Sequence, residues 1–251
     1  MKRILLILLV FIPFTYAGAS EQSEIISSAN NDFKEGKYAK AAEAYEKVIA
    51  SGVGSVEVYY NLGNSYFKLN KLPEAILNYE KAKKINPGDE DIVFNIKVAN
   101  SKIVDKIEVL PELFYIRYWK AVKNVFSVDQ WAKLVLVLFS LFFVMSGLYL
   151  YSRRQNFRII SFWLAIFLLI STGFAMTIAI KNYQLLVNQK EAIIFSAAIT
   201  VKSSPSESSV DLFVLHEGTK VVISDNLGTW LKITISNGSV GWIPASELRP
   251  I

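Results

Sequence analysis

The sequence predicts a multidomain membrane protein with an α-helical repeat domain, a two-helix transmembrane hairpin and a small all-β domain. Three observations lead to this fold class. Residues 23–104 repeat with a period of 34 positions, which is typical of a helical solenoid. Two later stretches lack charged residues over about the length that a bilayer requires. From about residue 190, short β-prone runs alternate with turn residues.

Composition and charge exclude several classes of function. The net charge of +5 comes from Lys2, Arg3 and the three arginines between 153 and 158, so the rest of the chain is neutral and nucleic-acid binding is not expected. The 251 residues include no cysteine and one histidine, which excludes disulfides, thiol catalysis and multi-histidine metal sites. His216 is interpreted as a surface loop residue, because no motif around it marks a partner nucleophile.

Residues 1–19 have the three-part layout of a signal peptide. A cationic start is followed by an apolar run over 4–12, by Pro13, and by small residues that allow cleavage after Ala19. The alternative is an uncleaved anchor, although about nine apolar residues are short for a span of about 20. In either case the segment that follows is expected to be exported.

Residues 20–104 are predicted to form helical hairpins. Residues of the same kind recur 34 positions apart, in the pairs Phe33 and Phe67, Lys34 and Lys68, Ala41 and Ala75, and Tyr45 and Tyr79. The second copy resembles a tetratricopeptide repeat at Tyr59, Leu62, Gly63, Tyr66, Ala75, Tyr79, Ala82 and Pro87. The resemblance implies close helix packing at Gly63 and Ala75, tight turns at Gly36 and Asn70, and a degenerate third copy that caps the domain.

In this repeat family the first helix of each hairpin lines a concave groove that binds peptides or other proteins. The residues expected to bind a partner there are Asn30, Phe33, Lys34, Asn64, Phe67, Lys68 and Lys102. A groove with lysine and amide side chains would suit an acidic peptide or a C-terminal carboxylate. The alternative is that these are ordinary solvated positions of a helix surface.

Residues 105–131 are predicted to contain a juxtamembrane helix in the membrane interface. At helical spacing, one stripe consists of Tyr115, Tyr118, Trp119, Val122 and Phe126, and the opposite stripe of Arg117, Lys120, Lys123 and Asn124. Opposite aromatic and basic stripes are typical of an interfacial helix, although a core helix of the repeat domain is the alternative. Ser127 and Gln130 have the spacing of a capping box, so a new helix is predicted to start there.

Residues 132–152 and 159–180 are predicted to be transmembrane helices. Apart from Lys133 near the start of the first, neither segment contains a charged residue. Backbone groups in hydrocarbon must form their hydrogen bonds within their own segment, so both segments are expected to be helical. The loop 153–158 contains three arginines and no acidic residue, which places it in the cytoplasm by the positive-inside rule. The repeat domain and the β-domain are then expected on the same, periplasmic side.

A stripe of small residues in the second predicted span consists of Ser171, Ala175 and Ala179. Small side chains at every fourth position allow two helices to pack closely. The stripe is interpreted as the internal seam of the hairpin, and contact with another protein is the less favoured alternative.

Residues 181–251 are predicted to form a small all-β domain. Strands are expected at 219–224, 230–236 and 240–243, with turns at 225–228 and at Asn237 and Gly238. The segments 201–206, 215–221 and 241–244, together with Trp230, resemble a bacterial SH3-like domain. The resemblance implies a barrel of five or six strands that commonly binds peptides or cell wall.

Trp230 and Trp242 are the aromatic residues of this domain that could line a ligand groove. The alternative is that they pack in the core of a very small barrel. For at least one of them this alternative is favoured.

The order of these parts resembles the BatE-like proteins of the Bacteroides aerotolerance (Bat) family, as does the linker 91–107 with Pro111. The resemblance implies a cell-envelope accessory protein in the bacterial inner membrane. Its expected partners are membrane-bound von Willebrand factor A-domain proteins and a MoxR-type ATPase. The resemblance implies no defined molecular activity.

The sequence therefore favours a membrane-anchored protein–protein interaction scaffold of the cell envelope. The alternative is an envelope sensor or wall-attachment protein whose SH3-like domain binds peptidoglycan peptides. Membrane lipid is an expected partner, and no cofactor or metal site is predicted. No constellation of catalytic residues appears at usable spacing, so the chain is not expected to be an enzyme.

Overall fold

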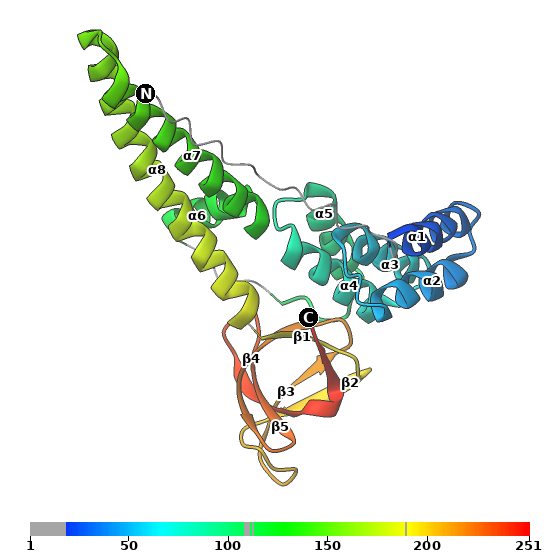
Figure 1. Cartoon of the computed structure of the whole chain (residues 1–251). Coiled ribbons are helices and arrows are strands. Elements are labelled where there is room, and N and C mark those ends of the chain that lie inside the picture. Colours follow the sequence, from blue (N-terminus) through cyan, green and yellow to red (C-terminus); the bar gives the residue numbers. More distant parts are fainter. Residues whose placement is uncertain (1–18, 108–110, 112, 189) are drawn as a thin grey trace.

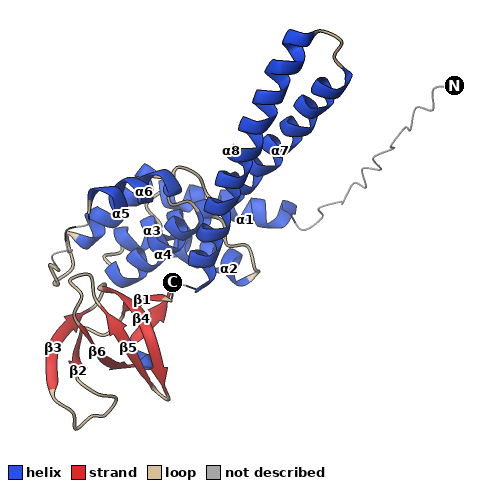
Figure 2. Cartoon of the chain, turned by 90° about the vertical axis from the view of Figure 1, so that its left-hand side faces the viewer, coloured by secondary structure: helices blue, strands red, loops and turns tan. Residues whose placement is uncertain are grey.

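The computed structural model describes residues 19–107, 111, 113–188 and 190–251. Almost all of the predicted signal peptide therefore lies outside the described residues. Within them, a helical repeat and an antiparallel sheet lie at the base of a long arm of two helices (Figure 1). The arm projects away from both (Figure 2).

The repeat consists of two helical hairpins and one further helix, with the bounds α1 Ala19–Lys34, α2 Tyr38–Ala50, α3 Val56–Lys68, α4 Leu72–Ile85 and α5 Glu90–Asn100. Side chains cap the N-termini of α3 and α5: the Ser55 hydroxyl accepts from the Val58 N–H at 3.2 Å, and Asp89 accepts from Ile92 at 3.2 Å. The turns inside the two hairpins require a left-handed residue, which is Gly36 at φ 78° in the first and Asn70 at φ 59° in the second. These turns are where the sequence predicted them.

Small residues allow the helices of the second hairpin to approach closely, as predicted. A Cβ added to Gly63 would lie 2.6 Å from the Tyr79 ring. Ala75 is fully buried, as is its counterpart Ala41 in the first hairpin. Tyr79 fills the space that these small residues leave, so large and small side chains complement one another across the hairpin.

Helix α6, Phe114–Asn124, is the amphipathic helix predicted within 105–131, and it is shorter than that range. None of its residues is buried, so it is not a core helix of the repeat. Part of its aromatic stripe packs on the arm, where the ring of Trp119 makes an edge contact with Phe174 at 6.2 Å between centroids. The rest is open, and Tyr118 is 72% exposed.

The arm consists of α7, Val128–Tyr151, and α8, Gln155–Asn188. The predicted capping box starts α7, where the Ser127 hydroxyl accepts from the Gln130 N–H and the Gln130 side chain accepts from the Ser127 N–H. Both helices are long and apolar enough to cross a membrane, and none of the most apolar part of α7 is buried within the protein. Ala175 is buried against residues of α7, so the small-residue stripe lies at the seam of the hairpin.

Helix α8 continues eight residues beyond the predicted end of the second span. The boundary of the β-domain drawn at 181 therefore lies inside this helix, and the first strand begins at Glu191. Residues 181–188 contain neither glycine nor proline, so nothing in them interrupts the helical hydrogen bonds.

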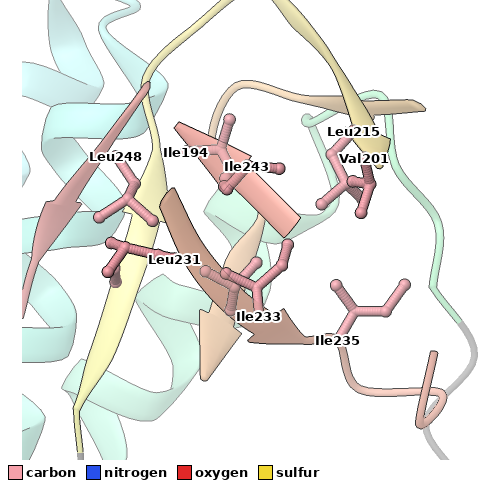
Figure 3. Close-up of a cluster of buried hydrophobic side chains, with 10 residues drawn as sticks. Ile194, Val201, Leu215, Leu231, Ile233, Ile235, Ile243 and Leu248 are labelled. Carbon is pink, nitrogen blue, oxygen red and sulfur yellow. The ribbon is translucent and has the colours of Figure 1, made fainter. Parts of the chain in front are cut away.

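Seven strands form one sheet in the order β3-β2-β6-β5-β4-β1-β7, and every pair is antiparallel. Their bounds are β1 Glu191–Ile194, β2 Ala198–Lys202, β3 Asp211–His216, β4 Lys220–Leu227, β5 Trp230–Thr234, β6 Val240–Pro244 and β7 Leu248–Pro250. The sheet curves around a single core to which all seven strands contribute apolar side chains (Figure 3). The resemblance implied five or six strands, and the described residues form seven because both ends of the domain pair with each other as β1 and β7.

Of the two hairpin turns predicted in this domain, one is confirmed and one is wrong. The turn at Asn237 and Gly238 is confirmed, with Gly238 at φ 87°. The turn predicted at 225–228 is wrong, since β4 continues through Leu227 and only Gly228 and Thr229 lie between the strands. A register shift between Ile223 and Asp225 allows the polar residues that suggested a turn to remain in the strand.

Candidate protein-binding groove

The first helices of the repeat enclose a pocket of about 200 Å³. Its lining comes from α1, α3, α4 and α5, in the residues Phe33, Asn64, Phe67, Lys68, Tyr79, Asn95 and Val98. Four residues predicted to bind a partner, Phe33, Asn64, Phe67 and Lys68, therefore meet at one place. Aromatic walls beside a cationic rim are suited to a peptide that carries both apolar and acidic groups.

The three recurring lysines lie at the ends of their helices. Lys34 and Lys68 are the last residues of α1 and α3, where a cation interacts favourably with the helix dipole. Lys102 follows the end of α5, and its Nζ lies 4.5 Å from the centroid of the Phe67 ring. All three are exposed. Among the described residues none of them forms an ion pair with a carboxylate, so their charges remain available.

The two asparagines predicted to bind a ligand have a structural role in each repeat. The Asn64 side-chain oxygen accepts from the Tyr79 hydroxyl at 2.8 Å and from the Asn95 amide at 3.0 Å. The corresponding oxygen of Asn30 accepts from Tyr45 at 2.5 Å and from Asn61 at 3.2 Å. Every member of the second set lies 34 positions after its counterpart in the first. The fold therefore uses the carbonyl oxygens of both asparagines, and their binding of a ligand stays a prediction.

This asparagine–tyrosine ladder joins each first helix to its own partner helix and to the first helix of the next hairpin. Burial raises the pKa of Tyr45 to about 12, and burial also raises the pKa of Tyr79, so both hydroxyls remain donors at neutral pH. Asn61 and Asn95 were not predicted as part of it. Their 34-residue spacing, which matches that of the other members, was the signal that could have found them.

Trp230 and Trp242 lie on the outer face of the curved sheet. Their neighbours along each strand, Leu231 and Ile243, point into the core, so the tryptophans point away from it. Both are partly buried. The interpretation favoured for at least one of them, packing in the core, is therefore wrong. Trp242 lies opposite Lys232 across β5 and β6, and Trp230 lies opposite Pro244.

His216 connects the sheet to Asp105, directly after the repeat, which corrects its interpretation as a surface loop residue. It is the last residue of β3, and its Nδ1 lies 2.7 Å from a carboxylate oxygen of Asp105. The other oxygen of Asp105 accepts from the His216 backbone N–H and from the Thr219 hydroxyl, each at 2.7 Å. Burial acts to raise the pKa of Asp105, but hydrogen bonds from Thr219 and His216 outweigh it and lower the pKa.

A second polar contact joins the same two parts. Lys220 Nζ lies 2.9 Å from Glu80 of α4 and 2.7 Å from Glu191 of β1. Burial acts to lower the pKa of Lys220, and the two carboxylates outweigh burial and raise it. Ile193 of β1 is fully buried in the hydrophobic cluster of the repeat beside these charges. The sheet is thus packed against helix α4 of the repeat.

Within the described residues no cluster of three or more histidine, cysteine, aspartate or glutamate side chains could hold a metal ion. The family model for the tetratricopeptide repeat matches residues 56–89, which contain α3, α4 and the turn after them. No curated protein matches the chain. Tetratricopeptide repeats are a protein-interaction module, so the pocket between α1, α3 and α5 is the candidate site for a protein partner.

Proposed function

We propose that this protein is a membrane-anchored scaffold of the bacterial cell envelope that holds a partner protein in its repeat groove. The observation that carries the proposal is the pocket between the first helices, with aromatic walls formed by Phe33 and Phe67 and the exposed Lys68 at its rim. The partner segment would be an acidic peptide or a C-terminal carboxylate, because lysine ammonium groups form charge-assisted hydrogen bonds with carboxylates.

Charge reversal tests the groove. The double variant Lys34→Glu and Lys68→Glu should weaken capture of acidic peptides at least tenfold, which corresponds to about 1.4 kcal/mol, because a carboxylate then meets repulsion instead of attraction. The helices should remain folded, since exposed lysines contribute little to stability. The measurement is binding of the full-length protein in detergent to arrayed acidic peptides, each with a free or an amidated C-terminus.

The control for this test carries the same change in net charge elsewhere. Lys47 on α2 and Lys97 on α5 are exposed and do not line the pocket. The variant Lys47→Glu and Lys97→Glu should bind the peptides as the unmodified protein does. If the two double variants lose affinity equally, the effect is one of net charge. If neither does, the lysines are a solvated surface and the groove loses its proposed chemistry.

We also propose that α7 and α8 span the inner membrane, with the turn between them in the cytoplasm and the other parts in the periplasm. Many apolar side chains along both helices are exposed, among them Phe143 at 59% and Ile170 at 67%. An apolar surface of this length is unfavourable in water and is typical of contact with lipid. A hairpin also returns both of its outer ends to the same side. A reporter active only outside the cytoplasm should function after Ile251 and remain silent when inserted at Gln155. Activity at Gln155 would overturn this topology.

The order of the parts supports a more specific proposal. We infer a role as an accessory subunit of a Bat-type aerotolerance or stress complex, beside von Willebrand factor A-domain proteins and a MoxR-type ATPase. Crosslinking in the native membrane, followed by identification of the partners, is the direct test. Recovery of neither class of partner would leave the scaffold proposal intact and remove this assignment.

The second candidate function is attachment to the cell wall through the sheet, which we propose to be SH3-like. The observation that favours it is the outward position of Trp230 and Trp242, since aromatic side chains held on a rigid sheet are suited to ligand binding. Retention of the full-length protein by purified cell wall, and its loss in the variant Trp230→Ala and Trp242→Ala, would support this function. Retention that does not depend on the tryptophans would contradict it.

A further inference from the structure

The turn between α7 and α8 lies at the end of the arm that is farthest from the repeat and the sheet (Figures 1 and 2). A pocket of about 550 Å³ opens there. Its lining combines cationic and aromatic side chains, among them Tyr149, Arg153, Gln155, Arg158, Phe162 and Trp163. The groove and the wall-binding surface described above do not include this pocket.

The charge around this pocket is entirely positive. The sequence contains no aspartate or glutamate between Asp129 and Glu191. Among the described residues, none of the three arginines at the turn forms an ion pair with a carboxylate. The Arg158 guanidinium lies over the Tyr149 ring, 5.4 Å from its centroid, and this cation–π contact holds it at the pocket wall. Guanidinium groups bind phosphate oxygens in a bidentate fashion, so an anion is the missing partner.

The apolar side of the pocket favours one kind of anion. Phe162 and Trp163 lie on α8 one turn after Arg158, about 6–8 Å along the helix, and are 42% and 64% exposed. Tryptophan is enriched where headgroups meet acyl chains. A free phosphate would use the arginines and leave these rings uncovered, whereas a phospholipid would contact both.

We propose that this pocket is a binding site for an anionic phospholipid, with its phosphate between Arg153 and Arg158 and its acyl chain along Phe162 and Trp163. The inference rests on the proposed membrane insertion of α7 and α8. It goes beyond the general preference of basic loops for the cytoplasmic side, because it assigns the contacts to two of the three arginines. Arg154 does not line the pocket, so it provides a control of equal charge.

The test uses the full-length protein in liposomes and nanodiscs. Flotation with liposomes of neutral phosphatidylcholine reports insertion alone. In nanodiscs, the melting temperature is then measured while phosphatidylglycerol replaces phosphatidylcholine, and the fraction that gives the half-maximal shift is an apparent affinity. We expect Arg158→Gln and Arg153→Gln each to raise that fraction at least threefold, and the double variant at least tenfold. We expect Arg154→Gln to leave it within a factor of two.

The outcomes are distinguishable. If the protein does not float with neutral liposomes, the membrane anchor fails and this proposal fails with it. If it floats but phosphatidylglycerol gives no shift, or Arg154→Gln weakens the shift as much as Arg158→Gln, the lipid site is overturned and the anchor stands. If inorganic phosphate in detergent stabilises the protein as phosphatidylglycerol does, the site binds a free anion and the lipid assignment is wrong.

Discussion

Asn64 illustrates how one polar residue can hold a helical repeat together. Its side-chain oxygen accepts hydrogen bonds from Tyr79 on the partner helix and from Asn95 on the next first helix. The Tyr79 side chain is almost completely buried, and a buried donor without an acceptor costs more than a typical hydrogen bond contributes. The residue is therefore constrained by the fold, independently of any ligand.

Replacement of Asn64 tests this role at the scale of a single residue. Asn64→Ala should destabilise the repeat by about 1–3 kcal/mol, because the Tyr79 hydroxyl loses its acceptor. In the double variant with Tyr79→Phe that hydroxyl is absent, so the two costs should not add, with a coupling of about 0.5 kcal/mol or more. Thermal unfolding of the four proteins of this cycle in detergent measures both effects. Strict additivity would show that the two side chains do not interact.

The helices of the second hairpin, α3 and α4, pack closely because small residues face large ones between them. Gly63 lies against the Tyr79 ring, and Ala75 is fully buried at the start of α4. Interiors packed to this density have no room for additional methylene groups. The family model for the tetratricopeptide repeat matches residues 56–89, which contain this hairpin. That repeat is defined by small and large residues at fixed spacing, and close packing of the two helices requires such a pattern.

At the scale of the element, Ala75→Leu should lower the free energy of unfolding of the hairpin by about 1–3 kcal/mol, because the larger side chain overpacks the contact between its helices. The matched control is Ala39→Leu, which makes the same change at an exposed position near the start of α2 and should have little effect. The measurement is the melting temperature of the repeat, followed by hydrogen exchange of α3 and α4. An unchanged melting temperature in Ala75→Leu would mean that the close approach at this position is not required.

In the whole molecule, the three parts are joined by specific contacts. A Cβ at Gly88, after α4, would lie 2.4 Å from the backbone oxygen of Asn124, so the repeat touches the end of α6 directly. The neighbouring Lys123 oxygen accepts from Trp131 of α7 and Asn182 of α8, each at 3.0 Å. With Asp105 holding the sheet, these contacts fix the groove relative to the arm. A partner in the groove would therefore be held at a defined distance from the membrane proposed above.

Asp105 gives a prediction at this scale. Asp105→Asn should weaken docking of the sheet by about 1–3 kcal/mol at pH 7, because the carboxylate that accepts from His216 and Thr219 is lost. The hydrogen bonds from Thr219 and His216 hold the native pKa of Asp105 below its usual value, which is about 3.9 in an unfolded chain. Its contribution is therefore fully present above pH 5 and disappears as the pH falls through the native pKa.

Melting temperatures between pH 5 and pH 3 check this prediction, because the partner imidazole of His216 changes its charge above this range. The difference between the unmodified protein and Asp105→Asn should be at its full size near pH 5 and should shrink as the pH falls further through the lowered native pKa of Asp105. The control Glu217→Gln removes one negative charge from an exposed neighbour of His216, and it should have little effect at any pH. A difference that grows as the pH falls from 5 to 3 would contradict the assigned direction.

Much of the fold could be predicted because local sequence determines it. The 34-residue period indicated the hairpins and their turns, and the capping box at Ser127 marked the start of α7. The absence of charge marked the two apolar helices. The turn predicted at 225–228 failed for a tertiary reason, since pairing with β5 keeps polar residues in the strand. Of the candidate site, Phe33, Asn64, Phe67 and Lys68 line one pocket, whereas the hydrogen bonds of the asparagine oxygens to Tyr45 and Tyr79 were not predicted.

The sequence by itself therefore determined the order of the parts, the repeat and the existence of two apolar helices, since each depends on the pattern along the chain. Only the tertiary structure decided the contacts between residues far apart. Asp105 and His216 are separated by 111 positions, and no period or motif links them. The same holds for Lys220 with Glu80 and for Gly88 with Asn124. The polar pairs form because a buried polar group is costly unless it has a hydrogen-bond or charge partner. The backbone contact forms because glycine has no side chain to keep the two segments apart.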